Sequence, residues 1–384
     1  MTFGPHLLLA NSAALEACEI SRSTPDPGGG VIEREPDGSP SGLMREVAQQ
    51  LIKNRRPDSE QNLTDRIHLE LEACARRGVT SISDVVTSPA ELRAYQTLDA
   101  QGRLPVRIRL LVRVFQSQIA TWSVRDLGIL TNFGSDMLQI GGIKVSVDGG
   151  SSAGQAAFYP RDGAAAGDQP VLRMSQDELD TVLKAYHEAG LQVCVHAVGD
   201  MAADMALRSF EAALGAAPRE DHRHRIEHLG NLGVNAERLG AARRLGLIPV
   251  PNPSGLYYLG TAAVATFGPD RLGRLYPFRW LIDEGLPFVG ASDGGGLWPV
   301  DPLRDIAAAV TRVTRSGDVV EPDQAISIEE ALGGYTSRAA WAGFGETRFG
   351  TLSPGMIAGI EVDVTIRGGR VVFERQAAGA AVTA

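Results

Sequence analysis

From residue 79 onward, the chain alternates short apolar segments with longer amphipathic ones. The apolar segments are rich in Val, Ile and Leu and predict strands over residues 79–86, 106–112, 142–147, 191–198, 225–229, 247–250 and 287–291. Between several of them, apolar residues recur every three to four positions, which predicts helices over residues 200–214, 234–245 and 302–316. Strands that alternate with helices form parallel sheets, and nearly continuous apolar strands indicate burial on both faces.

Two further helices have clear start signals. Ser175 and Glu178 have the spacing of a capping box, in which each side chain accepts a hydrogen bond from the other residue's backbone N–H. Gly190 then gives a stop signal. Ser327 and Glu330 repeat the capping box, so we expect one helix to begin at each pair.

The number of units favours a closed fold. Seven to eight strand–helix units over about 250 residues indicate a TIM-like (β/α)8 barrel. A doubly wound sheet remains the alternative, although no GxGxxG follows the first strand. A barrel needs eight strands and only seven segments are visible. We therefore expect the place of strand one to be empty or filled by the N-terminal 60 residues.

Two regions do not follow this alternation of strands and helices. Near the N-terminus, the pattern predicts short helices around Ser12–Cys18 and Leu43–Lys53. Near the C-terminus, alternating apolar residues around Gly368 and Gly369 predict a β hairpin, which is too small to fold alone. The expected organisation is a connector or lid of helices in 1–60, a barrel in 61–345 and a remnant of a small β domain in 346–384.

Composition and charge narrow the class of protein. The 384 residues are 43% hydrophobic and 22% charged, which excludes a disordered chain. Lys and Arg total 37 against 46 Asp and Glu, a net charge of −9 without a basic cluster, so we expect no nucleic-acid partner. Three scattered cysteines, without an export signal or a membrane span, lead us to expect a cytoplasmic protein and no membrane partner.

Candidate chemistry gathers at the ends of four predicted strands. In a parallel barrel, the carboxyl ends of the strands carry the active site. A lone histidine at a strand end is more often structural, but two histidines, an inward lysine and an aspartate on separate strands favour a metal site. These residues are Lys144, which shares a strand face with Ser146 and Asp148, and His196, His228 and Asp293.

Motifs along most of the chain carry a resemblance. They are His6–Leu15, Thr24–Gly42, Gly78–Ser81, Ile143–Gly149, His196–Asp200, Arg225–His228, Ser292–Asp293 with Asp301–Pro302, and Gly350–Gly355. In this order they resemble the amidohydrolase superfamily, and within it the amidohydrolase 3 group of YtcJ-like metal-dependent hydrolases. The resemblance runs nearly from end to end.

The resemblance implies a divalent metal, usually zinc, at the mouth of the barrel. His196 and His228 would be metal ligands, and Asp293 would be both a ligand and the general base. Lys144 occupies the position at which a carboxylated lysine can bridge two metals. The chemistry agrees, because imidazole suits zinc and a buried neutral lysine can take up carbon dioxide to become an anionic ligand.

The sequence departs from the family pattern at two places. The family's first strand ends in His-X-His, and no such motif follows a strand here; His222-Arg-His224 has the spacing but precedes a strand. Near the other end, Met356–Gly359 passes directly into Ile360, so one strand of the small β domain is missing. We therefore expect a chain that lacks the N-terminal part of the family and keeps a vestigial β domain.

The expected substrate is a small molecule held above the strand ends. Asn252 and His6 could orient a carbonyl group, while Tyr257 and Tyr258 could form an apolar wall. Packing among the loops themselves is the alternative for each ring. A homodimer is the assembly that we would test.

Three functions remain open at this stage. The first is hydrolysis of a C–N bond in an amide, N-acyl or carbamate-like substrate by a metal-activated water, with Asp293 returning the proton to the leaving amine. The second is a truncated or non-catalytic relative with weak or no metal binding, because two ligands are missing. The third is a lyase or isomerase, although only Gly294–Gly296 resembles a phosphate-binding loop.

Overall fold

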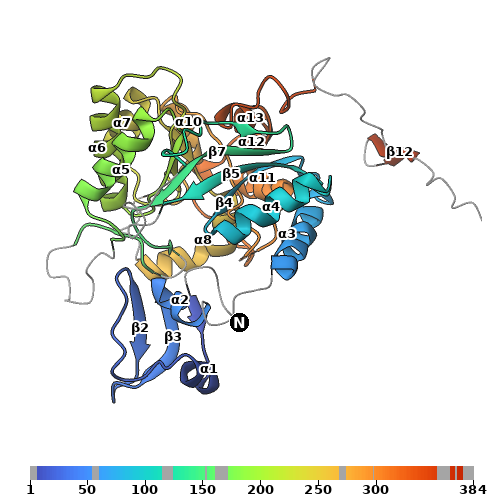
Figure 1. Ribbon diagram of the computed structural model, residues 1–384. Coiled ribbons are helices and arrows are strands. Elements are labelled where there is room, and N and C mark those ends of the chain that lie inside the picture. The colour runs from blue at the N-terminus through green and yellow to red at the C-terminus, as the bar shows by residue number, and fades with distance from the viewer. Residues whose placement is uncertain are drawn as a thin grey trace, which may run out of the picture.

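The computed structural model shows a curled parallel sheet wrapped by helices, with a smaller antiparallel sheet beside it (Figure 1). It describes residues 7–53, 60–114, 124–151, 154–160, 172–267, 274–296, 298–352, 364–367 and 370–374. No helix within these ranges is both long and apolar enough to cross a membrane.

The main sheet has six parallel strands in the spatial order β10-β9-β8-β7-β5-β4. A short strand, β6 (Phe133–Gly134), pairs antiparallel with β7. The parallel strands are β4 (Ser81–Val86), β5 (Arg107–Arg113), β7 (Leu138–Ser146), β8 (Val193–His196), β9 (Arg225–Glu227) and β10 (Ile248–Val250). They coincide with six of the seven predicted strands, and the order confirms a TIM-like α/β fold.

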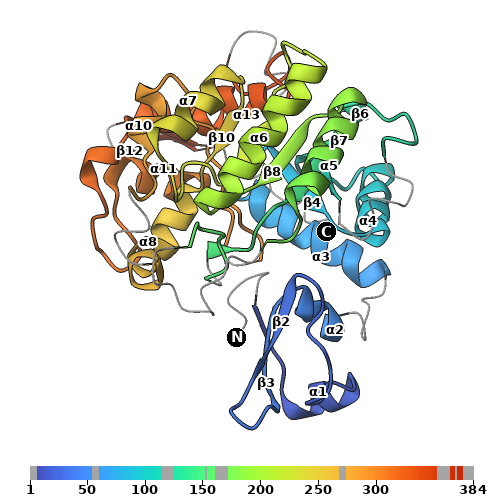
Figure 2. The same ribbon diagram turned by 90° about the vertical axis from the view of Figure 1, so that its left-hand side faces the viewer.

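Helices surround this sheet (Figure 2). They are α3 (Glu60–Ala75), α4 (Pro89–Ala100), α5 (Gln176–Glu188), α6 (Asp200–Ala216), α7 (Ala236–Arg244), α8 (Pro253–Phe267), α10 (Phe278–Asp283), α11 (Pro302–Thr311), α12 (Ile328–Tyr335), α13 (Ser337–Ala342) and the 3₁₀ turn η5 (Pro322–Gln324). In Figure 2, α5 and α6 cross in front of β7 and β8. Both predicted capping boxes are present, at Ser175 and Ser327. The largest buried cluster joins β7 and β8 to α5 and α6, which fixes the strand ends in a rigid layer.

The predicted strand over residues 287–291 is wrong, because this segment forms no ladder. It runs beside the end of β10, where Ala291 N donates to Pro251 O at 3.0 Å. The preceding amide, Gly290 N, donates to Gly334 O in α12 at 3.2 Å. A Cβ at Gly290 would lie 2.4 Å from the Tyr335 ring, so α12 presses directly onto this backbone. The helix thus takes one of the hydrogen bonds that a strand would use.

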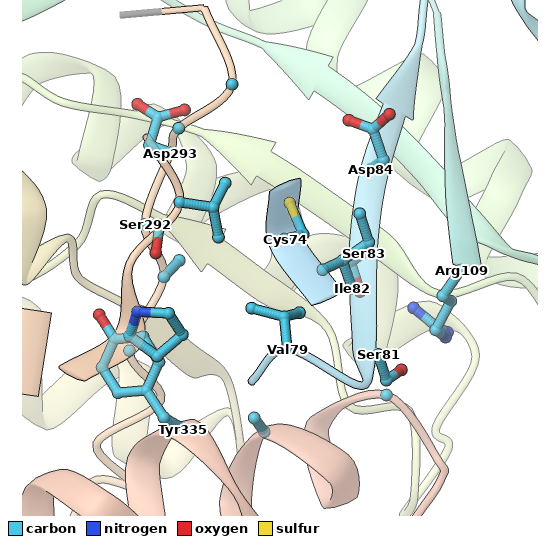
Figure 3. A pocket seen from close by; sticks show the side chains of 18 of the residues that line it. Cys74, Val79, Ser81, Ile82, Ser83, Asp84, Arg109, Ser292, Asp293 and Tyr335 are labelled. Atoms are coloured by element: carbon cyan, nitrogen blue, oxygen red, sulfur yellow. The ribbon is translucent and has the colours of Figure 1, made fainter. Parts of the chain in front are cut away.

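The main sheet does not close. Among the described residues, no strand pairs with the outer edge of β4. That edge faces a cavity of about 1060 Å³ whose opposite wall is residues 289–295. Figure 3 shows Ser81 and Ser83 on one wall, with Ser292 and Tyr335 on the other. The expected place of strand one is therefore open in the described structure.

The N-terminal region is mainly a β sheet, which corrects the expected connector of helices. β1 (Leu7–Leu9), β3 (Pro40–Glu46) and β2 (Gly30–Arg34) pair antiparallel in that order. The helix expected at Ser12–Cys18 is present as α1 (Ser12–Ala17). The one expected from Leu43 is not, because β3 continues to Glu46 before a 3₁₀ turn, η1 (Val47–Gln49), and a short α2 (Gln50–Lys53).

A two-residue period explains this difference. Alternate β3 residues Gly42, Met44 and Glu46 are buried, and Met44 packs on Ile32 of β2. Burial of every second residue is a strand pattern. The apolar residues of η1 and α2, which follow directly, made the whole segment resemble one helix. The predicted C-terminal hairpin is confirmed as β11 (Val364–Arg367) and β12 (Arg370–Glu374).

Candidate metal and active site

The ends of β8 and β9 bring two histidines together. His196 is the last residue of β8, and His228 follows β9 directly. Their ring centroids lie 4.5 Å apart at an angle of 76°, and the residues are only 6% and 9% exposed. Neighbouring parallel strands therefore place two imidazoles within reach of one ion.

Asn252 holds the His228 ring from behind. His228 Nδ1 lies 2.6 Å from Asn252 Oδ1, which also accepts from Asn231 Nδ2 at 2.7 Å. Asn231 Oδ1 in turn accepts from the Asn252 backbone N–H. An amide oxygen can only accept, so the hydrogen bond requires a proton on His228 Nδ1. The Asn252 side chain thus contacts His228, and Asn252 also lines the cavity beside it.

His196 is held by the loop after β7. His196 Nε2 lies 3.4 Å from Gly149 O and 3.5 Å from Asp148 Oδ1. Burial raises the pKa of Asp148 to about 7, although hydrogen bonds to its oxygens favour the charged form. These bonds come from the backbone N–H groups of Ala157, Val198 and Gly199, at 2.9 to 3.1 Å. Asp148 therefore ties the loop after β7 to the loop after β8.

Asp293 lies across a small cavity shared with His196 and His228. Its side chain is exposed and its backbone has a φ of +46°, a left-handed conformation that is rare outside glycine. The residue before it, Ser292, donates its hydroxyl to Asp305 Oδ2 at 2.5 Å. Ser292 O accepts from Ser254 Oγ and Trp298 Nε1. These bonds anchor the backbone that carries Asp293.

Lys144 points into the barrel and faces an acid. Its Nζ lies 4.0 Å from Glu227 Oε2, and the same Glu227 carboxylate accepts from Arg225 Nε at 2.8 Å. Burial lowers the pKa of Lys144, and the negative charge of Glu227 works in the opposite direction. Lys144 shares the wall of the large cavity with His228 and Asp293.

The histidine pair fits one ion better than two. Within the described ranges, no group of three or more His, Cys, Asp or Glu residues converges closely enough to hold a metal. Two imidazoles do converge, each with one nitrogen directed at a protein oxygen, as is usual for histidine ligands. His222 and His224 precede β9, so they lie at the opposite end of the strands from His228.

The aromatic residues form a stack beside the histidines. Tyr257 and Tyr258 lie in α8 with ring centroids 4.9 Å apart. Tyr258 stacks on Trp298 at 4.8 Å, and Trp298, rather than either tyrosine, lines the small cavity with His196. Trp298 could have been found from its place five residues after Asp293. His6 lies outside the described residues.

Comparison with known proteins identifies the family. The amidohydrolase family model matches residues 2–372. Protein LONG AFTER FAR-RED 3 of Arabidopsis thaliana is 30% identical over 92% of this chain. "Putative amidohydrolase YtcJ" of Bacillus subtilis is 27% identical over 96%, and an N-substituted formamide deformylase of Arthrobacter pascens is 27% identical over 93%.

The chain spans only part of these relatives, 62%, 73% and 66% of their respective lengths. Among solved structures, an uncharacterized metal-dependent hydrolase from Pyrococcus horikoshii has a TM-score of 0.72 and 25% sequence identity. That match covers 91% of this chain and 68% of the other. The sequence match and the shared fold agree, and the chain belongs to the amidohydrolase family.

Proposed function

We propose that this protein is a metal-dependent hydrolase that cleaves a C–N bond in a small amide, N-acyl or carbamate-like substrate. The observation that carries the proposal is the buried His196–His228 pair at adjacent strand ends, with Asp293 on the same cavity. Two similar proteins are named as a metal-dependent hydrolase and as an N-substituted formamide deformylase, which supports this reaction class.

The ion that we propose is zinc, because neutral imidazole is among its preferred ligands. His196 and His228 would hold it. Since His228 Nδ1 and His196 Nε2 face protein oxygens, we assign His228 Nε2 and His196 Nδ1 to the ion. When bound, zinc would polarise a carbonyl and lower the pKa of a water molecule to about 7.

Asp293 is the proposed general base. Its exposed carboxylate can take a proton from water in the small cavity and deliver it to the nitrogen of the leaving amine. The anchored Ser292 backbone keeps this carboxylate in place between the two transfers. Trp298 lines the same cavity and would give a bound substrate an aromatic surface.

Lys144 is the proposed additional ligand in a carboxylated form. Burial favours its neutral amine, the form that reacts with carbon dioxide. The present contact with Glu227 holds the amine inside the barrel, and the carbamate would need to turn away from that acid because the two charges repel.

The test is hydrolysis of a panel of N-formyl and N-acyl amines by the full chain loaded with zinc. We expect turnover that a chelator removes, and a loss of about 10²- to 10⁴-fold in kcat for Asp293→Asn with zinc retained. Asp301→Asn, at the N-cap of α11, is the control for loss of a nearby carboxylate. Turnover that survives both chelation and His196→Ala would overturn the proposal.

A non-catalytic relative is the second candidate, favoured by the lack of a third converging ligand in the described ranges. It predicts a folded chain that neither retains zinc nor hydrolyses any member of the panel. The same experiment therefore separates the two functions.

A further inference from the structure

A buried carboxylate of the N-terminal sheet reaches the loop that holds His196. Glu46 is the last residue of β3 and is 5% exposed. Its Oε1 accepts a hydrogen bond from Gly150 N at 3.3 Å, and its Oε2 pairs with Arg173. Gly150 and Arg173 lie near the two ends of the connection between β7 and α5. One side chain thus fastens both ends of that connection.

The first of those ends lies against the His196 ring. Gly149 O is 3.4 Å from His196 Nε2. At the other end, Arg173 N donates to Val147 O at 2.8 Å, so the returning chain runs beside the segment that carries Gly149. A displacement of either end would move the carbonyl that faces the imidazole.

Packing leaves the carboxylate little freedom. A Cβ at Gly149 would lie 2.8 Å from Glu46 Oε1 and 2.7 Å from Gln155 Cβ, so the peptide and the carboxylate are in close contact. Glu46 itself has φ +51° and ψ −124°, an unfavourable backbone conformation for a residue with a side chain. Such strain persists only where the surroundings determine the conformation, and it concentrates at functional sites.

We propose that Glu46 is a positioning residue of the metal site, through which the N-terminal sheet fixes the orientation of His196. The inference rests on the proposed function, since it concerns the same ion. A charged, buried hydrogen-bond partner is stronger than a neutral one and holds its geometry more tightly. The N-terminal sheet is then a structural part of the site and not a lid over it.

Glu46→Gln is the variant that tests this role. It keeps the shape and an oxygen for Gly150 N, but it removes the charge that pairs with Arg173. Glu33→Gln is the matched control, because Glu33 lies in the same sheet and pairs with Arg45 at 2.5 Å on the partly exposed side. Both variants remove one carboxylate charge and one ion pair of the N-terminal sheet.

The first measurement is zinc affinity of the metal-free full chain, by competition with a chromophoric chelator. Loss of contacts that orient a ligand costs about 10- to 100-fold in affinity, so we expect that loss for Glu46→Gln and less than about 3-fold for Glu33→Gln. The visible absorption of bound Co²⁺ should change only in Glu46→Gln. Equal zinc affinities and equal Co²⁺ spectra in the two folded variants would overturn the inference.

The second measurement needs no metal. Hydrogen exchange of the metal-free chain should be faster at residues 149–151 and 154–157 in Glu46→Gln and unchanged in Glu33→Gln. If Glu46→Gln does not fold, Arg173→Gln, which keeps the Glu46–Gly150 bond, takes its place with a smaller expected loss of affinity. Unchanged exchange in the variant would refute the contact between Glu46 and the loop. If the wild type binds no zinc but Glu46→Gln still exchanges faster, only the proposed function is refuted.

Discussion

At the scale of single residues, the candidate site residues can be recognised by their place at strand ends. The orientation of their side chains depends on partners from other loops. His196, His228 and Asp293 stand out in the sequence because each lies at the end of an apolar segment. The hydrogen bonds that orient the two histidines come from residues that lie about 20 to 50 positions away, Asn252 for His228 and the Gly149 carbonyl for His196. No local pattern marks such a contact, so the orienting role of Asn252 could be found only in the structure.

Asn252→Ala should weaken metal binding through His228. Without the amide oxygen, the His228 ring loses its hydrogen bond to Asn252 Oδ1 and can turn. We expect zinc affinity to fall by about 10- to 100-fold, measured by competition with a chelator. Asn235→Ala, which removes the cap of α7 at a cost of about 1 kcal/mol, should leave the affinity unchanged. Equal affinities in both variants would count against the assigned orientation.

At the scale of elements, period and capping predict most of the fold, and the two errors have physical causes. The strands of the sheet and the capped helices α5 and α12 follow from local signals. The failures fall at β3, where a two-residue period runs into a helical turn, and at residues 287–291, where α12 takes a backbone hydrogen bond. Both depend on packing against another element, which the local sequence does not contain.

Three buried histidines, His187, His222 and His224, form a network at the amino ends of β8 and β9. His187 Nδ1 lies 2.9 Å from His224 Nε2, and His187 Nε2 lies 2.6 Å from Ala217 O. His224 Nδ1 accepts from Val193 N, and His222 Nδ1 accepts from His224 N. Each ring thus has one accepting nitrogen, which fits three neutral rings.

This network should destabilise the fold in acid. Burial lowers the pKa of His222 and holds that of His224 well below its usual value, whereas both are about 6.5 in an unfolded chain. Below that pH the unfolded state binds protons that the folded state excludes, so stability falls with a limiting slope of about 1.4 kcal/mol per pH unit and ring. His224→Gln should remove part of this slope between pH 6.5 and 5. The measurement is the free energy of unfolding by denaturant at each pH.

The comparison must be made between variants, because buried acids act in the opposite direction. Burial raises the pKa of Asp305 to about 6, and a proton bound there in the folded state adds stability as the pH falls. Asp305 is present in both wild type and His224→Gln, so its contribution cancels when their slopes of stability against pH are compared. A slope that is identical in both proteins would contradict the neutral network.

At the scale of the whole molecule, the sequence predicts an incomplete barrel and the structure shows where it opens. Seven apolar segments instead of eight indicate the missing strand. The structure adds that the cavity runs between β4 and residues 289–295, and that the N-terminal sheet pairs separately. Counting segments could not show this, because it depends on which elements pair across the chain.

The open edge should make β4 the least protected strand on its side of the sheet. Within the described ranges, β4 pairs with β5 alone, whereas β7 and β8 are each paired on both sides. Backbone groups at an edge have no sheet partner on one side and open more readily. Hydrogen exchange should therefore be faster in residues 81–86 than in 142–146 or 193–196. Equal protection in all three segments would mean that β4 is covered in solution.

The central claim is that His196 and His228 hold one ion, and zinc content measures it most directly. The purified full chain, loaded with zinc and freed of excess metal, should retain about one equivalent by mass spectrometry. His196→Ala and His228→Ala should each retain almost none, and His68→Ala, on α3 beside Glu72, should match the wild type. A wild-type chain without zinc, or histidine variants that keep a full equivalent, would contradict the claim.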